Sequence, residues 1–160
     1  MKIIDNIQKI INYKFQDDSL LLEALTHKSM TSQSSNEVLE FLGDRVLSLI
    51  ISEKLIKLFP QDNEGILDKK LSKLIDKDAC YRVAIKINLM EFVQLGKTEV
   101  NSEGNHKKSI LSNCCEALIG AIYKDGGFEE VKKFIMFFWE DLFKDLELKP
   151  IDPKSALQEV

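Results

Sequence analysis

Residues 36 to 44, with the sequence NEVLEFLGD, constrain the fold most, because they place three acids at helical spacing. Glu37, Glu40 and Asp44 are separated by three and then four residues. At about 100° per residue, these offsets bring the three side chains within about 60° of one another on a helix. Apolar residues continue the pattern, so the sequence predicts a helix from Glu37 to Leu58, with Asn36 at its N-cap.

The three acids can be interpreted in two ways. Like charges on one face repel each other, whereas Mg²⁺ is a hard cation that binds carboxylate oxygens and would hold them together. Apolar neighbours indicate that part of the cluster lies near the core: Leu39, Phe41, Leu42, Val46, Leu47, Leu49 and Ile50. The alternative is a solvated acidic face close to the N-terminus of a helix, which the helix macrodipole also favours.

A second group of polar residues lies in an apolar segment between residues 107 and 123, which we also predict to be a helix. Asn113 and Glu116 share one face there, and they are its only strongly polar side chains after Ser112. An ionised Glu in such a segment needs a metal or another cation as a partner, since an unpaired buried charge is costly. The alternative is a Glu that is hydrogen-bonded to the backbone or to a lysine.

These segments together resemble the ribonuclease III catalytic domain. Residues 36–44 are similar to its signature asparagine–glutamate–arginine–leucine–glutamate–phenylalanine–leucine–glycine–aspartate. Residues 24–29 (ALTHKS), 63–65 (NEG), 109–111 (SIL) and 116–120 (EALIG) fit the same family in the same order. The resemblance implies an all-α endonuclease domain over residues 1–148 that forms a homodimer.

The resemblance also implies a role for each matching residue. Asp44 and Glu116 are the catalytic acids, and the metal site is formed by Glu40, Asp44, Asn113 and Glu116. Glu37 and Glu64 would line the cleavage valley, although Glu64 could equally be an ordinary acid in the first turn of a helix. Phe41 would insert into a pocket of the partner subunit, and the alternative is an ordinary core aromatic.

The implied reaction is hydrolysis of phosphodiester bonds in double-stranded RNA, as in the processing of rRNA and mRNA precursors. The resemblance implies Mg²⁺ as the cofactor, with Mn²⁺ able to substitute, and products with 5′-phosphate and 3′-hydroxyl ends. Magnesium ions held by carboxylates activate water and stabilise the charge that grows on the phosphate.

Asn113 departs from the family pattern, which usually has Asp at this position. An amide oxygen still binds Mg²⁺ but carries no negative charge, so we expect weaker metal affinity. The alternative function is therefore a catalytically impaired family member that binds double-stranded RNA or serves as a scaffold. Val38 replaces the arginine of the signature, at a position that need not touch the metal.

The net charge of −4 has the wrong sign for a protein that binds RNA through its phosphates. Local basic clusters remain at residues 69, 70 and 73 and at residues 107 and 108. From these we predict RNA contacts by Lys73, Lys107 and Lys108. The alternative is a solvated helix face and a loop.

The rest of the sequence indicates a cytoplasmic helical domain without a membrane span. The N-terminus lacks the apolar stretch of a signal peptide, and the three cysteines suit a reducing compartment. We expect further helices over residues 3–11, 19–25, 64–75, 78–87 and 128–146, and a loop over 96–105. Residues 149–160, which contain Pro150 and Pro153, are expected to be a linker and the start of a truncated double-stranded-RNA-binding domain.

Overall fold

The computed structural model describes residues 2–30, 35–96 and 104–148, and its elements in these ranges are helices. They are α1 (Lys2–Ile11), α2 (Asp18–Ala24), α3 (Glu37–Leu58), α4 (Glu64–Ile75), α5 (Lys77–Ile87), the 3-10 turn η1 (Leu89–Glu91), α7 (Asn105–Gly126), α8 (Phe128–Phe138) and α9 (Glu140–Leu148). An isolated bridge between Thr26 and Gln94 is the only strand-like pairing in the described ranges. The all-α prediction is confirmed.

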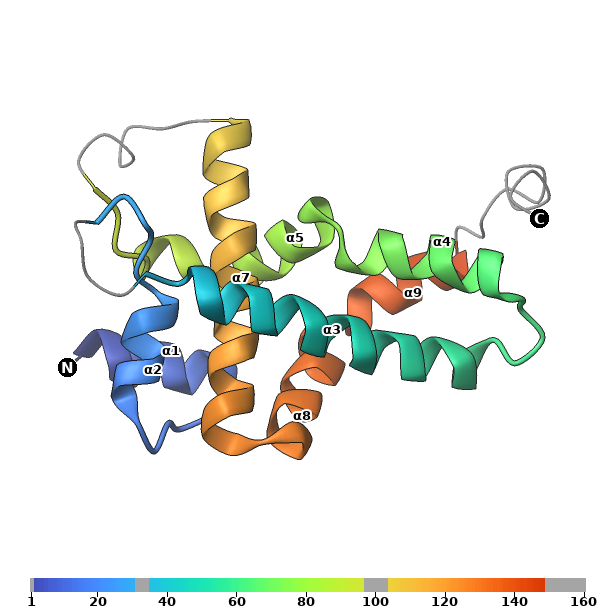
Figure 1. Ribbon diagram of the computed structural model, residues 1–160, viewed down its shortest axis with the longest axis horizontal. Coiled ribbons are helices and arrows are strands. Elements are labelled where there is room, and N and C mark those ends of the chain that lie inside the picture. Colours follow the sequence, from blue (N-terminus) through green and yellow to red (C-terminus); the bar gives the residue numbers. More distant parts are fainter. Residues whose placement is uncertain (1, 31–34, 97–103, 149–160) are drawn as a thin grey trace.

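Two long helices, α3 and α7, cross at the centre of the molecule (Figure 1). Helix α7 also contacts α2, α5 and α8, so most of its surface is covered. That position explains its nearly continuous apolar sequence. The fully buried side chains on α7 are Cys114, Cys115, Ala117, Leu118, Ile119, Ala121 and Ile122.

Two glycines allow α3 and α7 to cross backbone against backbone. A Cβ atom on Gly43 would lie 1.7 Å from the carbonyl oxygen of Glu116. A Cβ atom on Gly120 would lie 2.2 Å from the carbonyl oxygen of Leu39. Larger residues at either position would separate the helices, so this pair sets the distance between the acids of α3 and those of α7.

Most helix boundaries follow the predictions, including the N-cap position of α3. Helices α3 and α4 have the predicted bounds, and the Asp17 side chain caps α2 by accepting a hydrogen bond from the Ser19 amide. Asn36 occupies the N-cap position of α3, but its side chain makes no cap hydrogen bond. Instead it is buried, and its Nδ2 donates to the carbonyl oxygen of Ala24.

The predicted single helix over residues 128–146 is wrong, because the chain turns at Trp139. Helix α8 ends at Phe138 and α9 begins at Glu140. The Trp139 ring is fully buried, and its Nε1 donates to the carbonyl oxygen of Leu74, 2.7 Å away. The turn lets α9 pack on α4.

Two predictions concern residues outside the described ranges. The expected loop over 96–105 falls mostly on residues 97–103, and the expected linker falls on residues 149–160. Among the described helices, none combines the length and the apolar character that crossing a bilayer requires.

Candidate metal and catalytic site

The crossing of α3 and α7 brings together acids that lie far apart in the sequence. Glu40 and Asp44 are one turn apart on α3, and both are half-buried. Glu116 lies on α7 beside the backbone of Gly43, so its carboxyl group is next to that of Asp44. A protonated Glu116 carboxyl can donate a hydrogen bond to Asp44, which favours the protonated form.

The electrostatics of this cluster favour protons or cations. Burial raises the pKa of Glu116 to about 8, helped by the hydrogen bond to Asp44 and the charges of Asp44 and Glu40, while Arg45 opposes the rise. Burial also raises the pKa of Glu40, as do the charges of Glu37 and Asp44, while Lys28 lowers it. The three central carboxylates therefore share a partly desolvated place where full ionisation is unfavourable without a positive partner.

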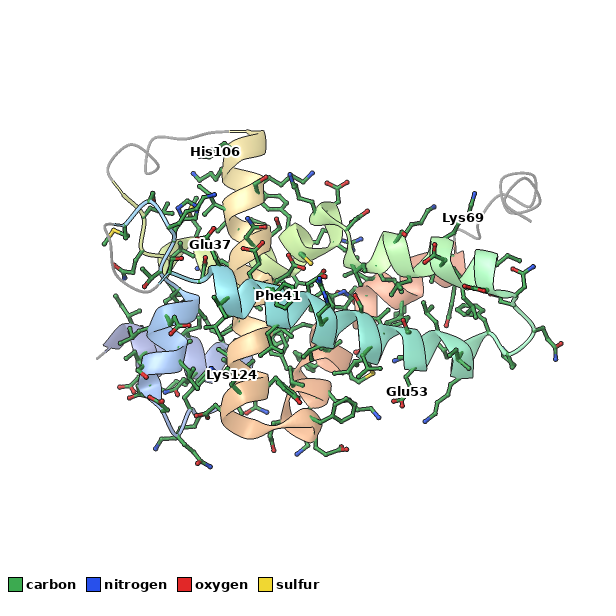
Figure 2. All side chains as sticks on the ribbon, viewed as in Figure 1. Glu37, Phe41, Glu53, Lys69, His106 and Lys124 are labelled. Carbon is green, nitrogen blue, oxygen red and sulfur yellow. The ribbon has the colours of Figure 1, made fainter. Side chains whose placement is uncertain are left out.

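Glu37 and Phe41 lie on the first turns of α3 (Figure 2). Glu37 is exposed, and its charge reaches Glu40, which places it at the rim rather than in the centre. The Phe41 ring is 61% exposed, so the alternative of an ordinary core aromatic is wrong for this subunit.

Asn113 lies on α7 three residues before Glu116 and is half-buried. Residues at this spacing share a helix face, so the amide and the Glu116 carboxyl belong to the same side of α7. Its role as a metal ligand stays a prediction.

The chemistry of the donor set suits a hard divalent cation. Three carboxylates and one amide are oxygen ligands, which Mg²⁺ prefers. In the part of the chain that the structure describes, however, no three His, Cys, Asp or Glu side chains are arranged to hold a metal ion as they stand. At Asp44, Oδ2 instead accepts a hydrogen bond of 2.7 Å from Nη1 of Arg45.

Glu64 lies away from the cluster in its own subunit. It begins α4 after the Asn63 cap and lines a groove of about 280 Å³ together with Ser52 and Ile56 of α3. Ser52 is eight residues from Asp44, which corresponds to about 12 Å along a helix. One subunit therefore does not bring Glu64 to the other acids.

The predicted basic clusters are only partly available for RNA. Lys70 is buried, its Nζ donates to Oδ2 of Asp62 at 2.5 Å, and it lies 3.4 Å from the centroid of the Phe59 ring. Lys70 thus stabilises the connection between α3 and α4, and its assignment to a basic cluster for RNA is wrong.

The three lysines predicted to contact RNA have different environments. Lys73 is exposed on α4, and Lys107 is half-buried near the start of α7. Lys108 forms an ion pair with Asp78. RNA binding by these residues stays a prediction. To bind RNA, Lys108 would have to exchange the Asp78 carboxylate for a phosphate.

Arg45 is a residue of the site that the sequence analysis missed. It pairs with Asp44, and its guanidinium carbon lies 4.3 Å from the centroid of the Phe41 ring. The available signal was its position, directly after an acid and four residues after an aromatic, a spacing at which helical side chains meet.

Comparison with known proteins agrees with the fold. The family model described as Ribonuclease-III-like matches residues 17–142. Ribonuclease 3 of Wolbachia pipientis subsp. Culex pipiens is 45% identical over 161 residues, which cover 97% of this chain and 70% of that protein. Ribonuclease 3 of Pelagibacter ubique is 41% identical over 153 residues, which cover 96% of this chain and 68% of that protein.

Solved structures show the same likeness. The nuclease domain of ribonuclease III from Campylobacter jejuni superposes with a TM-score of 0.84 at 40% identity, over 88% of this chain and 99% of that one. Dicer from Pichia stipitis shares the fold, with a TM-score of 0.68 at 23% identity, over 87% of this chain and 62% of that one. The helical fold is thus that of an endonuclease domain. The chain belongs to the ribonuclease III family, a family of endoribonucleases.

Proposed function

We propose that this domain is a Mg²⁺-dependent endoribonuclease that hydrolyses phosphodiester bonds in double-stranded RNA and leaves 5′-phosphate and 3′-hydroxyl ends. The observation that carries the proposal is the contact between the Asp44 and Glu116 carboxyl groups across the glycine crossing, with Glu40 one turn away. A carboxyl group whose pKa is raised by neighbouring carboxylates gains most from a divalent cation, and such an ion can drive phosphodiester hydrolysis.

The residues of the cluster have separable roles in this proposal. Oxygens of Glu40, Asp44, Asn113 and Glu116 would hold the cation. When bound, a divalent cation lowers the pKa of water and neutralises charge on the phosphate. Without it, Glu116 holds a proton near neutral pH, since its pKa is about 8. Ionisation of Glu116 is therefore linked to filling of the site.

A homodimer is the second part of the proposal. Helix α3 carries an apolar stripe of Val38, Phe41, Leu49 and Ile56, each more than half exposed. Exposed apolar patches on a helix favour burial against a second copy. The related Campylobacter domain has a region involved in dimer formation. A second subunit on this stripe would also explain how Glu64, distant from the cluster in its own subunit, can line the same valley.

Asn113 supports weaker metal binding rather than a different function. The comparisons give the scaffold alternative no support, and the self-repelling acids are retained around the amide. A neutral oxygen at this position removes one negative charge from the site, so we expect a higher Mg²⁺ requirement than in an Asn113→Asp variant.

The test is a gel assay of long double-stranded RNA at low salt with excess Mg²⁺. Low salt is needed because binding through phosphates falls steeply as salt rises. The parent chain, Asn113→Asp and Glu116→Gln are compared on the duplex and on one of its strands alone. We expect the parent and Asn113→Asp to cut the duplex, and Glu116→Gln to leave it intact. Absence of duplex cleavage by both the parent and Asn113→Asp would overturn the proposal.

A further inference from the structure

The Arg45 guanidinium connects an exposed aromatic to the acid cluster. Its Nη1 donates to Oδ2 of Asp44 at 2.7 Å, and its Cζ lies 4.3 Å from the centroid of the Phe41 ring. Phe41 precedes Arg45 by four residues, so the ring lies one turn away on the same side of α3. One cation thus touches both the apolar stripe and a carboxylate that is a predicted metal ligand.

The exposure of this pair shows that stabilising the fold is not its main effect. The side chains of Arg45 and Asp44 are 61% and 37% exposed, and ion pairs as exposed as this contribute little to stability. What distinguishes the contact is the identity of the acceptor. Asp44 lies next to Glu116 and one turn from Glu40, and its charge acts on both, so Arg45 neutralises the carboxylate at the centre of the cluster.

We propose that Arg45 is a positioning residue that occupies Asp44 in place of a divalent cation while its guanidinium is held on the Phe41 ring. This inference rests on the proposed function, because it assumes that Asp44 binds the metal. The guanidinium holds Oδ2 of Asp44 and places a positive charge beside the site, so Arg45 and the cation compete for the same carboxylate. Any event that buries or moves the Phe41 ring, such as contact with a second copy of the chain, then moves Arg45 and changes the positive charge beside Asp44.

The first test measures metal affinity directly, with Mn²⁺ as the probe and no RNA present. Free Mn²⁺ is quantified by electron paramagnetic resonance during titration of the parent chain and of Arg45→Gln. Loss of an exposed ion pair that opposes binding should tighten Mn²⁺ binding about two- to fivefold. Unchanged or weaker binding in Arg45→Gln, while the parent binds Mn²⁺, would overturn the inference and leave the proposed function standing.

A matched variant separates the contact from the general effect of charge. Lys28 is exposed, and its charge acts on Glu40, whereas the ion pair with Asp44 is made by Arg45. Lys28→Gln therefore removes the same unit charge near the cluster without freeing Asp44. We expect it to tighten Mn²⁺ binding by less than half as much as Arg45→Gln does. Equal effects of the two variants on Mn²⁺ affinity would show that Arg45 acts only through its charge, and would overturn the inference.

The role of the ring is tested by a double-variant cycle with Phe41→Leu, which keeps apolar bulk but removes the aromatic face. Phe41→Leu should tighten Mn²⁺ binding in the parent background and have no effect in the Arg45→Gln background. The same effect in both backgrounds would overturn the link through Arg45. All four proteins are compared at a concentration where sedimentation shows the same oligomeric state.

One outcome tests the proposed function itself. If no variant binds Mn²⁺, including Asn113→Asp, both the proposed function and the role of Arg45 are overturned. Binding by the parent chain that does not respond to Arg45→Gln overturns only the role of Arg45.

Discussion

Gly43 lies directly against the backbone of Glu116, and a Cβ atom at position 43 would be 1.7 Å from the carbonyl oxygen of Glu116. The residue after this glycine is Asp44, whose carboxyl group meets that of Glu116. The acids therefore meet because the two helices have no side chains between them at this point. A glycine, rather than an attraction between carboxylates, sets the geometry of the site.

Substitution of Gly43 by Ala should destabilise the domain strongly. The added methyl group would overlap a backbone carbonyl that cannot rotate away, so α3 and α7 must separate. We expect a loss of about 3 kcal/mol in the free energy of unfolding, even though alanine favours helix more than glycine does. Urea unfolding followed by circular dichroism measures this loss.

Gly65 supplies the matched control on α4. A Cβ atom there would meet only Oδ1 of Asn63 at 3.6 Å, an ordinary contact. Gly65→Ala should leave stability unchanged or raise it by about 0.5–1 kcal/mol. Parent-like stability in Gly43→Ala would show that the two helices do not pack as closely as described.

The stability of the metal-free domain should fall as the pH rises from about 4.5 to about 8. Glu116 has a pKa of about 8 in the folded chain against 4.5 for an ordinary glutamate. In this window the folded state holds the proton more tightly than the unfolded state, so raising the pH favours unfolding. Glu40, whose pKa is also raised, acts in the same direction.

Thermal unfolding in EDTA at pH 5 and pH 8 measures this effect. The parent chain should lose more stability between the two values than Glu116→Gln does, because glutamine has no proton to release. Added Mg²⁺ should recover stability at pH 8 more than at pH 5, since the cation replaces the proton. A parent and a variant with equal losses would place Glu116 outside the coupled cluster.

Glu116→Gln should also reduce cleavage of double-stranded RNA by more than about 100-fold, since even outer-shell changes at metal sites cost 10–100-fold. Glu116 lies on α7 and is not one of the exposed apolar residues of the stripe on α3, so the variant should keep the oligomeric state of the parent. The cleavage gel and sedimentation velocity are run on the same preparations. Cleavage by Glu116→Gln at the parent rate would show that Glu116 is not part of the catalytic site.

Local signals in the sequence predicted much of this architecture. The bounds of α3 and α4 follow from periodicity and from polar residues before each helix. The acids of α3 follow from their spacing, and Glu116 from its apolar surroundings. Their meeting point depends on the pairing of Gly43 with Gly120, which periodicity does not encode.

What could not be predicted depends on contacts between distant segments. The turn at Trp139 has no glycine or proline to mark it, and it depends on a hydrogen bond to the backbone of Leu74. Asn36 has the residue type of a cap, yet its side chain binds the carbonyl of Ala24. The separation of Glu64 from Asp44 likewise depends on the packing of α4 against the later turns of α3, beside Ser52 and Ile56.

Phe41→Ala should weaken self-association of the domain, because Phe41 is an exposed aromatic in the middle of the apolar stripe on α3. Truncating a buried aromatic anchor of an interface typically costs 2 kcal/mol or more, which corresponds to about a 30-fold weaker dimer. Sedimentation velocity over a range of protein concentrations measures the change.

Phe137→Ala is the matched control for this experiment. Phe137 is 64% exposed against 61% for Phe41, but it lies on α8, where it packs edge-on against Phe138. Its removal takes away the same exposed ring area from a different face, so the dimer should persist. An unaltered profile for Phe41→Ala would place the interface elsewhere, and an equal loss in both variants would indicate nonspecific apolar association instead of a defined dimer on α3.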